Sequence, residues 1–189
     1  RQMCIRDRYK VGSSYETPGS TGLSHALEHM MFKGSGKLGP GEASRILREL
    51  GAEENAFTSD DYTAYYQVLA SDRLGVALEL EADRLASLKL PADEFAKEIE
   101  VIKEERRLRT DDRPSSLAYE RFKAMAYPAS GYSIPTIGWM ADLERMHIDD
   151  LRAWHQKWYA PNNATLVVVG DVSVDEVKSC LLYTSDAAD

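Results

Sequence analysis

Two histidines four residues apart, with a glutamate beside the second, place the strongest constraint on how this chain of 189 residues can fold. His25, Glu28 and His29 lie in residues 22–32, whose apolar spacing predicts a helix. Residues four apart share one face of a helix, so both imidazoles are able to bind one metal ion. Imidazole suits zinc, and a catalytic zinc site uses three protein ligands and one open position. The fold must therefore bring a third ligand to this helix.

Glu28 lies next to the paired histidines, where a carboxylate is able to take a proton from a water that attacks a carbonyl. The order His-x-x-Glu-His is the inverzincin signature. The alternative is a helix that carries the same three side chains on a solvent-facing side without any metal.

The third ligand has more than one source in the sequence. His147 is expected near a helix N-terminus and His155 on an amphipathic helix, so both are expected to be structural. A helix expected over residues 91–109 is the better source, and its glutamates are Glu94, Glu98, Glu100, Glu104 and Glu105. Glu98 and Glu105 fall on one face of that helix. A solvated charged face is the ordinary explanation, and spacing alone does not choose the ligand.

The order of strand and helix patterns predicts an α+β fold. Strands are expected at residues 10–14, at 56–70 with a break at 59–61, and at 164–170. The remaining helices are expected at residues 42–50, 71–88 with Ser71 as N-cap, 115–126, 139–145, 149–159 and 171–178. Strands, a run of helices and a final strand favour a mainly antiparallel sheet with helices packed on one face.

Composition excludes several classes of function. Hydrophobic residues make up 43% of the chain, which is enough for a core. The net charge of −8 argues against binding to nucleic acid or to an anionic membrane. No apolar run approaches the roughly 18 residues that a membrane span needs.

Four separated segments resemble the pitrilysin-type inverzincins, in the order found in that family. They are HALEH, ASRILRELGAEENAFTS, KEIEVIKEERR and WYAPNNATLVVVGDV. The family includes pitrilysin, insulin-degrading enzyme and the mitochondrial processing peptidase, and the chain is most similar to its bacterial members. The resemblance implies a zinc-dependent endopeptidase domain, with one Zn²⁺ per site, that hydrolyses extended peptides or unfolded polypeptides.

The resemblance also implies a role for each site residue. His25 and His29 match the zinc-binding histidines, and Glu28 matches the catalytic base. The family's third ligand is the later of two glutamates seven residues apart, which matches Glu105. The earlier one matches Glu98, a carboxylate that would support a ligand histidine by hydrogen bonding.

Residues 55–58 match the family's edge strand, which receives the substrate as an added strand. Main-chain hydrogen bonds would hold any extended peptide there, and side-chain pockets would set the preference. The four matching residues are Asn55, Ala56, Phe57 and Thr58. The alternative is a plain core strand in which Phe57 only packs.

The two ends do not resemble the rest of the chain. Residues 1–8, RQMCIRDR, and 180–189, CLLYTSDAAD, hold both cysteines, and neither has a periodicity that matches its neighbour. Both resemble translated sequencing-adapter read-through. We therefore expect residues 9–179 to be an incomplete N-terminal zinc peptidase domain from a longer gene, without cysteine.

Family members close two or four homologous domains around the substrate, and the second half supplies an arginine and a tyrosine. We therefore expect a homologous C-terminal domain or partner subunit, and little or no activity from this fragment alone. Many bacterial relatives are exported, which favours a periplasmic location. Two alternatives stay open, a non-catalytic scaffold subunit of the same family and a structural zinc-binding domain.

Overall fold

The computed structural model describes residues 1–186. One antiparallel sheet has the strand order β2-β3-β1-β4, so β2 and β4 are its edges. Its strands are β1 (Gln2–Tyr9), β2 (Glu53–Thr58), β3 (Thr63–Ala70) and β4 (Ala164–Gly170). The break expected at residues 59–61 is confirmed, because a tight turn there joins β2 to β3.

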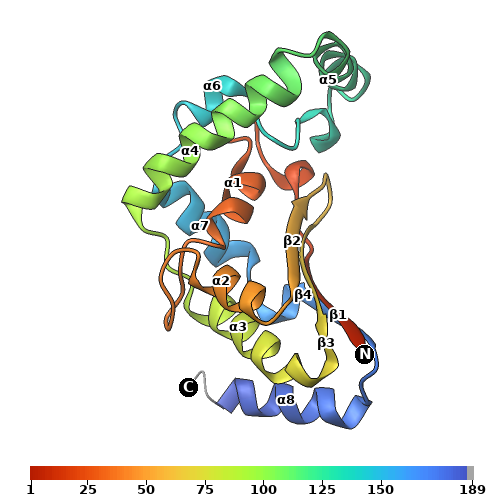
Figure 1. Ribbon diagram of the computed structural model, residues 1–189. Coiled ribbons are helices and arrows are strands. Elements are labelled where there is room, and N and C mark those ends of the chain that lie inside the picture. The colour runs from red at the N-terminus through yellow and green to blue at the C-terminus, as the bar shows by residue number, and fades with distance from the viewer. Residues whose placement is uncertain (187–189) are drawn as a thin grey trace.

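Helices cover one face of this sheet, as Figure 1 shows. They are α1 (Leu23–Met30), α2 (Glu42–Glu49), α3 (Leu74–Ser87), α4 (Ala92–Arg106), α5 (Pro114–Ala126), α6 (Met140–Leu143), α7 (Ile148–Trp158) and α8 (Val174–Asp186). The predicted α+β fold, with an antiparallel sheet and helices on one face, is confirmed. Within residues 1–186, no helix is long and apolar enough to cross a bilayer.

The main core lies between the sheet and the helices α1, α4 and α7. Tyr9 and Tyr65 from the sheet meet Leu27 of α1, Ile102 of α4 and Leu151 of α7, and all five are buried. Burial of apolar area of this kind is the main favourable term in folding. Since the apolar side of α1 enters this core, its other side is left to face a cleft.

Residues 1–8 form most of a central strand, which the sequence analysis did not predict. β1 pairs with β3 on one side and β4 on the other. Met3, Ile5 and Tyr9 are buried on the helix-covered face, which is the period-two pattern of a strand. Asp7 occupies the fourth buried position, and its charge hid the alternation.

Three other boundaries differ from those expected. Residues 10–14 are not a strand: a 3-10 helix, Ser13–Tyr15, follows β1 after a short loop. Ser71 does not cap a helix with its side chain, since it begins a 3-10 turn, Ser71–Arg73, ahead of α3. The acidic helix α4 ends at Arg106 and continues as a π-helical turn, Arg107–Asp111. The origin of residues 1–8 and 180–189 stays a prediction.

Candidate metal centre

A carboxylate from outside the helix fixes the start of α1. The first N–H groups of a helix have no partner within it. Glu16, which is 5% exposed, accepts hydrogen bonds from the N–H groups of Gly22 and Ser24, both at 2.7 Å. Gly22 has φ +86°, and a Cβ there would lie 2.8 Å from the carbonyl oxygen of Ile137. A glycine is therefore required where α1 begins.

The two faces of α1 have different surroundings. Ala26, Leu27 and Met30 are fully buried in the main core. The opposite side carries His25 and His29, whose side chains are 12% and 21% exposed at the cleft. Core packing of one face therefore orients both imidazoles toward the same space.

Helix α4 brings Glu105 to the two histidines. Its Oε2 atom lies 3.6 Å from Nε2 of His25 and 3.4 Å from Nε2 of His29. One ligand atom from each residue lies within 4.8 Å of the other two. Zinc bonds of about 2.0–2.1 Å in tetrahedral geometry separate ligand atoms by roughly 3.3–3.4 Å. Oε2 of Glu105 is buried without a hydrogen-bond partner among the described residues, so the three donors fit a small metal ion.

A metal ligand must be deprotonated, and the pKa shifts of His25 and Glu105 favour that state before any metal binds. Burial, and then the neighbouring His29, lower the pKa of His25 to about 4, so its imidazole is neutral at pH 7. The close contact with the His29 ring lowers the pKa of Glu105, which keeps it ionised. Burial acts to lower the pKa of His29, but its contacts with Glu105 and Glu98 outweigh this and raise it.

Glu98 holds the other side of the His29 ring. His29 Nδ1 lies 2.9 Å from Oε1 of Glu98, which leaves Nε2 facing Glu105. Lys33, just beyond α1, places Nζ 2.5 Å from Oε2 of the same carboxylate. Burial would raise the pKa of Glu98, but Lys33 and His29 lower it below the usual range. The sequence analysis did not identify Lys33, because it lies beyond the end of α1 and its partner is on another helix, so no local spacing indicates the contact.

Glu28 is 9% exposed in the same cleft. Burial raises the pKa of its carboxyl group, and a hydrogen bond from Thr58 acts in the opposite direction. Thr58 donates from Oγ1 to Oε2 of Glu28 at 2.5 Å. The carboxylate of the motif is thus tied to the last residue of β2.

The edge strand β2 forms one wall of this cleft, which has a volume of about 820 Å³. All four residues of segment 55–58 line it. Phe57 is half-buried, and its ring contacts Tyr62 edge-on with centroids 5.6 Å apart. The side of β2 away from β3 pairs with no strand among residues 1–186, so its main chain is open to an added strand.

Other candidates lie away from the three donors. Glu104 is 58% exposed and pairs with Arg107 on the outer side of the helix. His147 is the N-cap of α7, as expected, and His155 stacks on Tyr159.

Arg109 was not predicted: its guanidinium lies 2.8 Å from Oε1 of Glu105 and lines the cleft. It lies four residues after Glu105, a spacing at which opposite charges meet on a helix.

Comparison with protein-family models gives two matches. The family described as insulinase, peptidase family M16, matches residues 9–138. The inactive domain of peptidase M16 matches residues 145–184. The first match includes all the residues of the candidate metal centre.

Known proteins resemble the chain over most of its length. It is 41% identical over 169 residues to the zinc protease PqqE of Helicobacter pylori, a match that covers 89% of this chain and 38% of that protein. The crystal structure of a Helicobacter pylori protease superimposes with a TM-score of 0.95 and 38% identity, over 97% of this chain and 44% of the other. The periplasmic protease PqqL of Escherichia coli shares the fold, with a TM-score of 0.88 at 24% identity over 100% of this chain and 22% of the other. The chain spans about two fifths of the length of the curated relatives it matches.

Proposed function

Since this chain belongs to the insulinase family of peptidases, family M16, we propose that it carries the zinc site of an endopeptidase that cleaves extended peptides. The family membership confirms the resemblance read from the sequence, and a peptidase-type function is that of the family. One observation carries the finer proposal: donor atoms of His25, His29 and Glu105 converge beside the carboxylate of Glu28.

The three donors match what a catalytic zinc ion requires. Two imidazoles and one carboxylate leave a fourth position open in tetrahedral geometry. Zinc, when bound, would supply a Lewis acid for both a water molecule and a peptide carbonyl. Curated relatives are named zinc proteases, which supports this metal.

In this proposal Glu28 moves the proton. A carboxylate beside the reacting water accepts its proton as the water attacks, then passes that proton to the leaving amine. Burial that raises the pKa of Glu28 makes it a stronger base than an exposed glutamate. Glu98 would hold His29 in the tautomer whose Nε2 faces the metal.

The substrate would add to β2 as a further strand. The free edge of β2 lies along the cleft that contains Glu28, so main-chain hydrogen bonds would bring an extended peptide to the site. This mode favours unfolded or flexible polypeptides, because a folded chain has already paired its backbone groups.

We make three further proposals about the complete protein, its natural sequence and its location. The complete enzyme would include a homologous C-terminal domain or partner subunit, without which this fragment would have little or no activity. Residues 9–179 would be the natural part of the sequence, and resequencing the genomic locus tests that. A periplasmic location, inferred from the resemblance, is tested by fractionating cells that express the full-length gene.

The decisive experiment uses the full-length gene product. Zinc content is measured by atomic spectroscopy, and cleavage of an unstructured peptide is followed for wild type and Glu28→Gln. We expect one zinc per site in both proteins and cleavage in the wild type only. Glu104→Gln is the matched control, since that glutamate lies on the outer side of α4 and should leave both readouts unchanged.

Two outcomes would contradict the proposal. Zinc without cleavage by the wild type would indicate a scaffold subunit of the same family. A fourth protein ligand that closes the metal site would indicate a structural zinc domain.

A further inference from the structure

The strand that would receive the substrate also contacts the proposed base. Thr58 is the last residue of β2, and its Oγ1 atom donates a hydrogen bond to Oε2 of Glu28 at 2.5 Å. Glu28 itself lies on α1, so the contact joins the edge of the sheet to the metal-centre helix. A hydrogen bond to a charged group is among the stronger ones in proteins, and it also fixes the direction of the carboxylate.

The end of β2 is held in place by its pairing with β3. Thr58 is paired in register with Thr63, the first residue of β3. Thr63 is fully buried, and its hydroxyl donates to the carbonyl oxygen of Val11 at 3.0 Å. The backbone that carries Thr58 is therefore held against the loop that follows β1.

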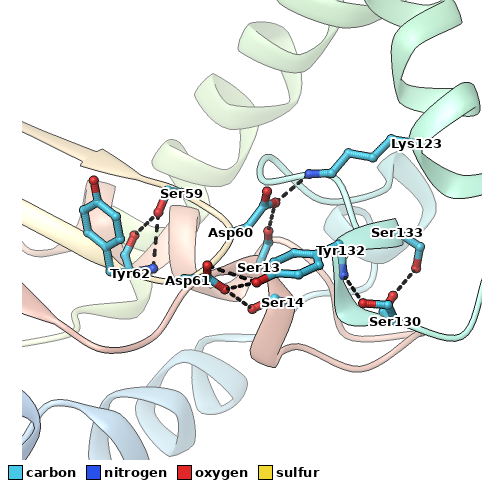
Figure 2. A network of polar contacts seen from close by, with 10 residues as sticks. All are labelled: Ser13, Ser14, Ser59, Asp60, Asp61, Tyr62, Lys123, Ser130, Tyr132 and Ser133. Carbon is cyan, nitrogen blue, oxygen red and sulfur yellow. Dashed lines mark hydrogen bonds and ion pairs between the residues drawn. The ribbon is translucent and has the colours of Figure 1, made fainter. Parts of the chain in front are cut away.

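Asp60, in the turn directly after Thr58, contacts two other segments of the chain that hold this turn in place. Asp60 accepts a hydrogen bond from Nζ of Lys123, on α5, at 2.6 Å and another from the hydroxyl of Ser13 at 3.1 Å. Figure 2 shows the carboxylate of Asp60 between these two partners, which come from two other segments of the chain. Lys123 is 19% exposed at its side chain, so solvent screens this ion pair only in part.

Asp61, the next residue of the turn, also accepts hydrogen bonds from two other segments of the chain. The hydroxyl of Tyr132 lies 3.1 Å from both carboxylate oxygens of Asp61, and the hydroxyl of Ser14 donates to Oδ1 at 3.0 Å (Figure 2). A Cβ on Gly12 would lie 2.2 Å from the carbonyl oxygen of Ser59, so this close approach requires glycine. We call Asp60, Asp61, Lys123 and Tyr132 the turn clamp.

We propose that Thr58 is a positioning residue that orients the carboxylate of Glu28, and that the turn clamp keeps the Thr58 hydroxyl directed at it. The inference rests on the proposed function and deepens it. A peptide added to β2 would lie on the same strand whose last residue holds the base. Binding of the substrate backbone and alignment of the base are then coupled through one short, clamped segment.

The test compares Thr58→Val, which keeps the shape and removes the hydroxyl, with Thr58→Ser, which keeps the hydroxyl. Both are made in the full-length gene product. We expect Thr58→Val to lower kcat about tenfold or more, in line with loss of a hydrogen bond to a charged group, with KM and zinc content little changed. Thr58→Ser should restore kcat to within about threefold of wild type.

A second readout does not depend on activity. In crystal structures of the zinc-free proteins, Glu28 should leave its wild-type rotamer in Thr58→Val and keep it in Thr58→Ser. Asp60→Asn, which weakens the turn clamp, should shift Thr58 away from Glu28 and lower kcat without removing zinc. Thr165→Val, an exposed threonine on the opposite edge strand, is the control and should match wild type.

The outcomes separate this inference from the proposed function. One outcome is that wild type cleaves the peptide, Glu28→Gln does not, and Thr58→Val keeps the wild-type kcat. The proposed role of Thr58 would then be wrong, while the proposed endopeptidase function would be supported. Equal loss of kcat in Thr58→Val and Thr58→Ser would also overturn that role, because packing rather than the hydroxyl would then matter. Absence of cleavage by wild type contradicts the proposed function and this inference with it.

Discussion

Nδ1 of His29 lies 2.9 Å from Oε1 of Glu98, while Nε2 of the same ring faces Glu105. One imidazole thus bridges two carboxylates of α4 that are two helical turns apart. The ionised Glu98 accepts a hydrogen bond from the Nδ1–H group, which leaves the Nε2 lone pair free for a metal. Glu98 therefore orients the imidazole, while Glu105 is the proposed metal ligand.

Glu98→Gln is expected to weaken zinc binding about 10–100-fold, because the tautomer and orientation of His29 would no longer be held by a carboxylate. Competition with a chromogenic chelator measures the affinity. Glu100→Gln is the control on the same helix, since that glutamate is 65% exposed and pairs with Lys103. Equal affinities for wild type and Glu98→Gln would contradict the supporting role.

Glu105→Gln is expected to lose zinc at concentrations where Glu104→Gln keeps it. The two side chains are neighbours in sequence, but only Glu105 places a carboxylate oxygen within 4 Å of both histidines. Metal content after gel filtration in buffer without added zinc checks this. Zinc loss in Glu104→Gln alone would show that the wrong ligand was chosen.

Glu120→Ala is expected to destabilise the fold by about 3 kcal/mol, because it removes the two-bond partner of a buried guanidinium and leaves it the more distant carboxylate of Asp111, 3.3 Å away. Arg106 is 4% exposed and binds Glu120 through two hydrogen bonds, at 2.8 and 2.9 Å, which ties α4 to α5. Denaturant unfolding measures the change. Arg107→Ala removes an exposed pair on the same turn and should cost less than about 1 kcal/mol.

Glu16 is expected to make stability depend on pH. Burial, assisted by the nearby Asp142, raises the pKa of Glu16 from 4.5 to about 7. The hydrogen bonds from the two N–H groups at the start of α1 act to lower this pKa, but burial outweighs them. Between these values the folded state binds more protons than the unfolded state, so the free energy of unfolding falls as pH rises. Relative to Glu16→Gln, which does not titrate, the wild type should lose roughly 2–3 kcal/mol of stability between pH 4.5 and 8.

Urea titrations of both proteins across that range give the comparison. A difference that grows in favour of the wild type with rising pH would mean that the helix N-terminus outweighs burial at Glu16. A difference that does not change with pH would mean that the carboxyl group titrates alike in both states. Either result would contradict the raised pKa.

Much of the fold could be predicted because its signals are local. The spacing of Leu27 and Met30 indicated a helix with one apolar side, and the composition of residues 164–170 indicated a strand. The prediction that this strand is buried was wrong, because β4 lies at the edge of the sheet and leaves Val167 and Val169 exposed. β1 was missed because Asp7 interrupts the alternation of Met3, Ile5 and Tyr9. Its charge is compensated at long range by Arg84, 3.6 Å away on α3, which no local pattern reveals.

For the candidate site, the sequence by itself determined that His25, Glu28 and His29 share a helix, since spacing on a helix sets direction. It also placed Glu98 and Glu105 on one face of another helix. Only the tertiary structure decided that α4 packs against α1 with Glu105, not Glu104, facing the histidines. Likewise only packing brought Thr58 to Glu28, because contacts between distant segments depend on how buried faces fit together rather than on any local pattern.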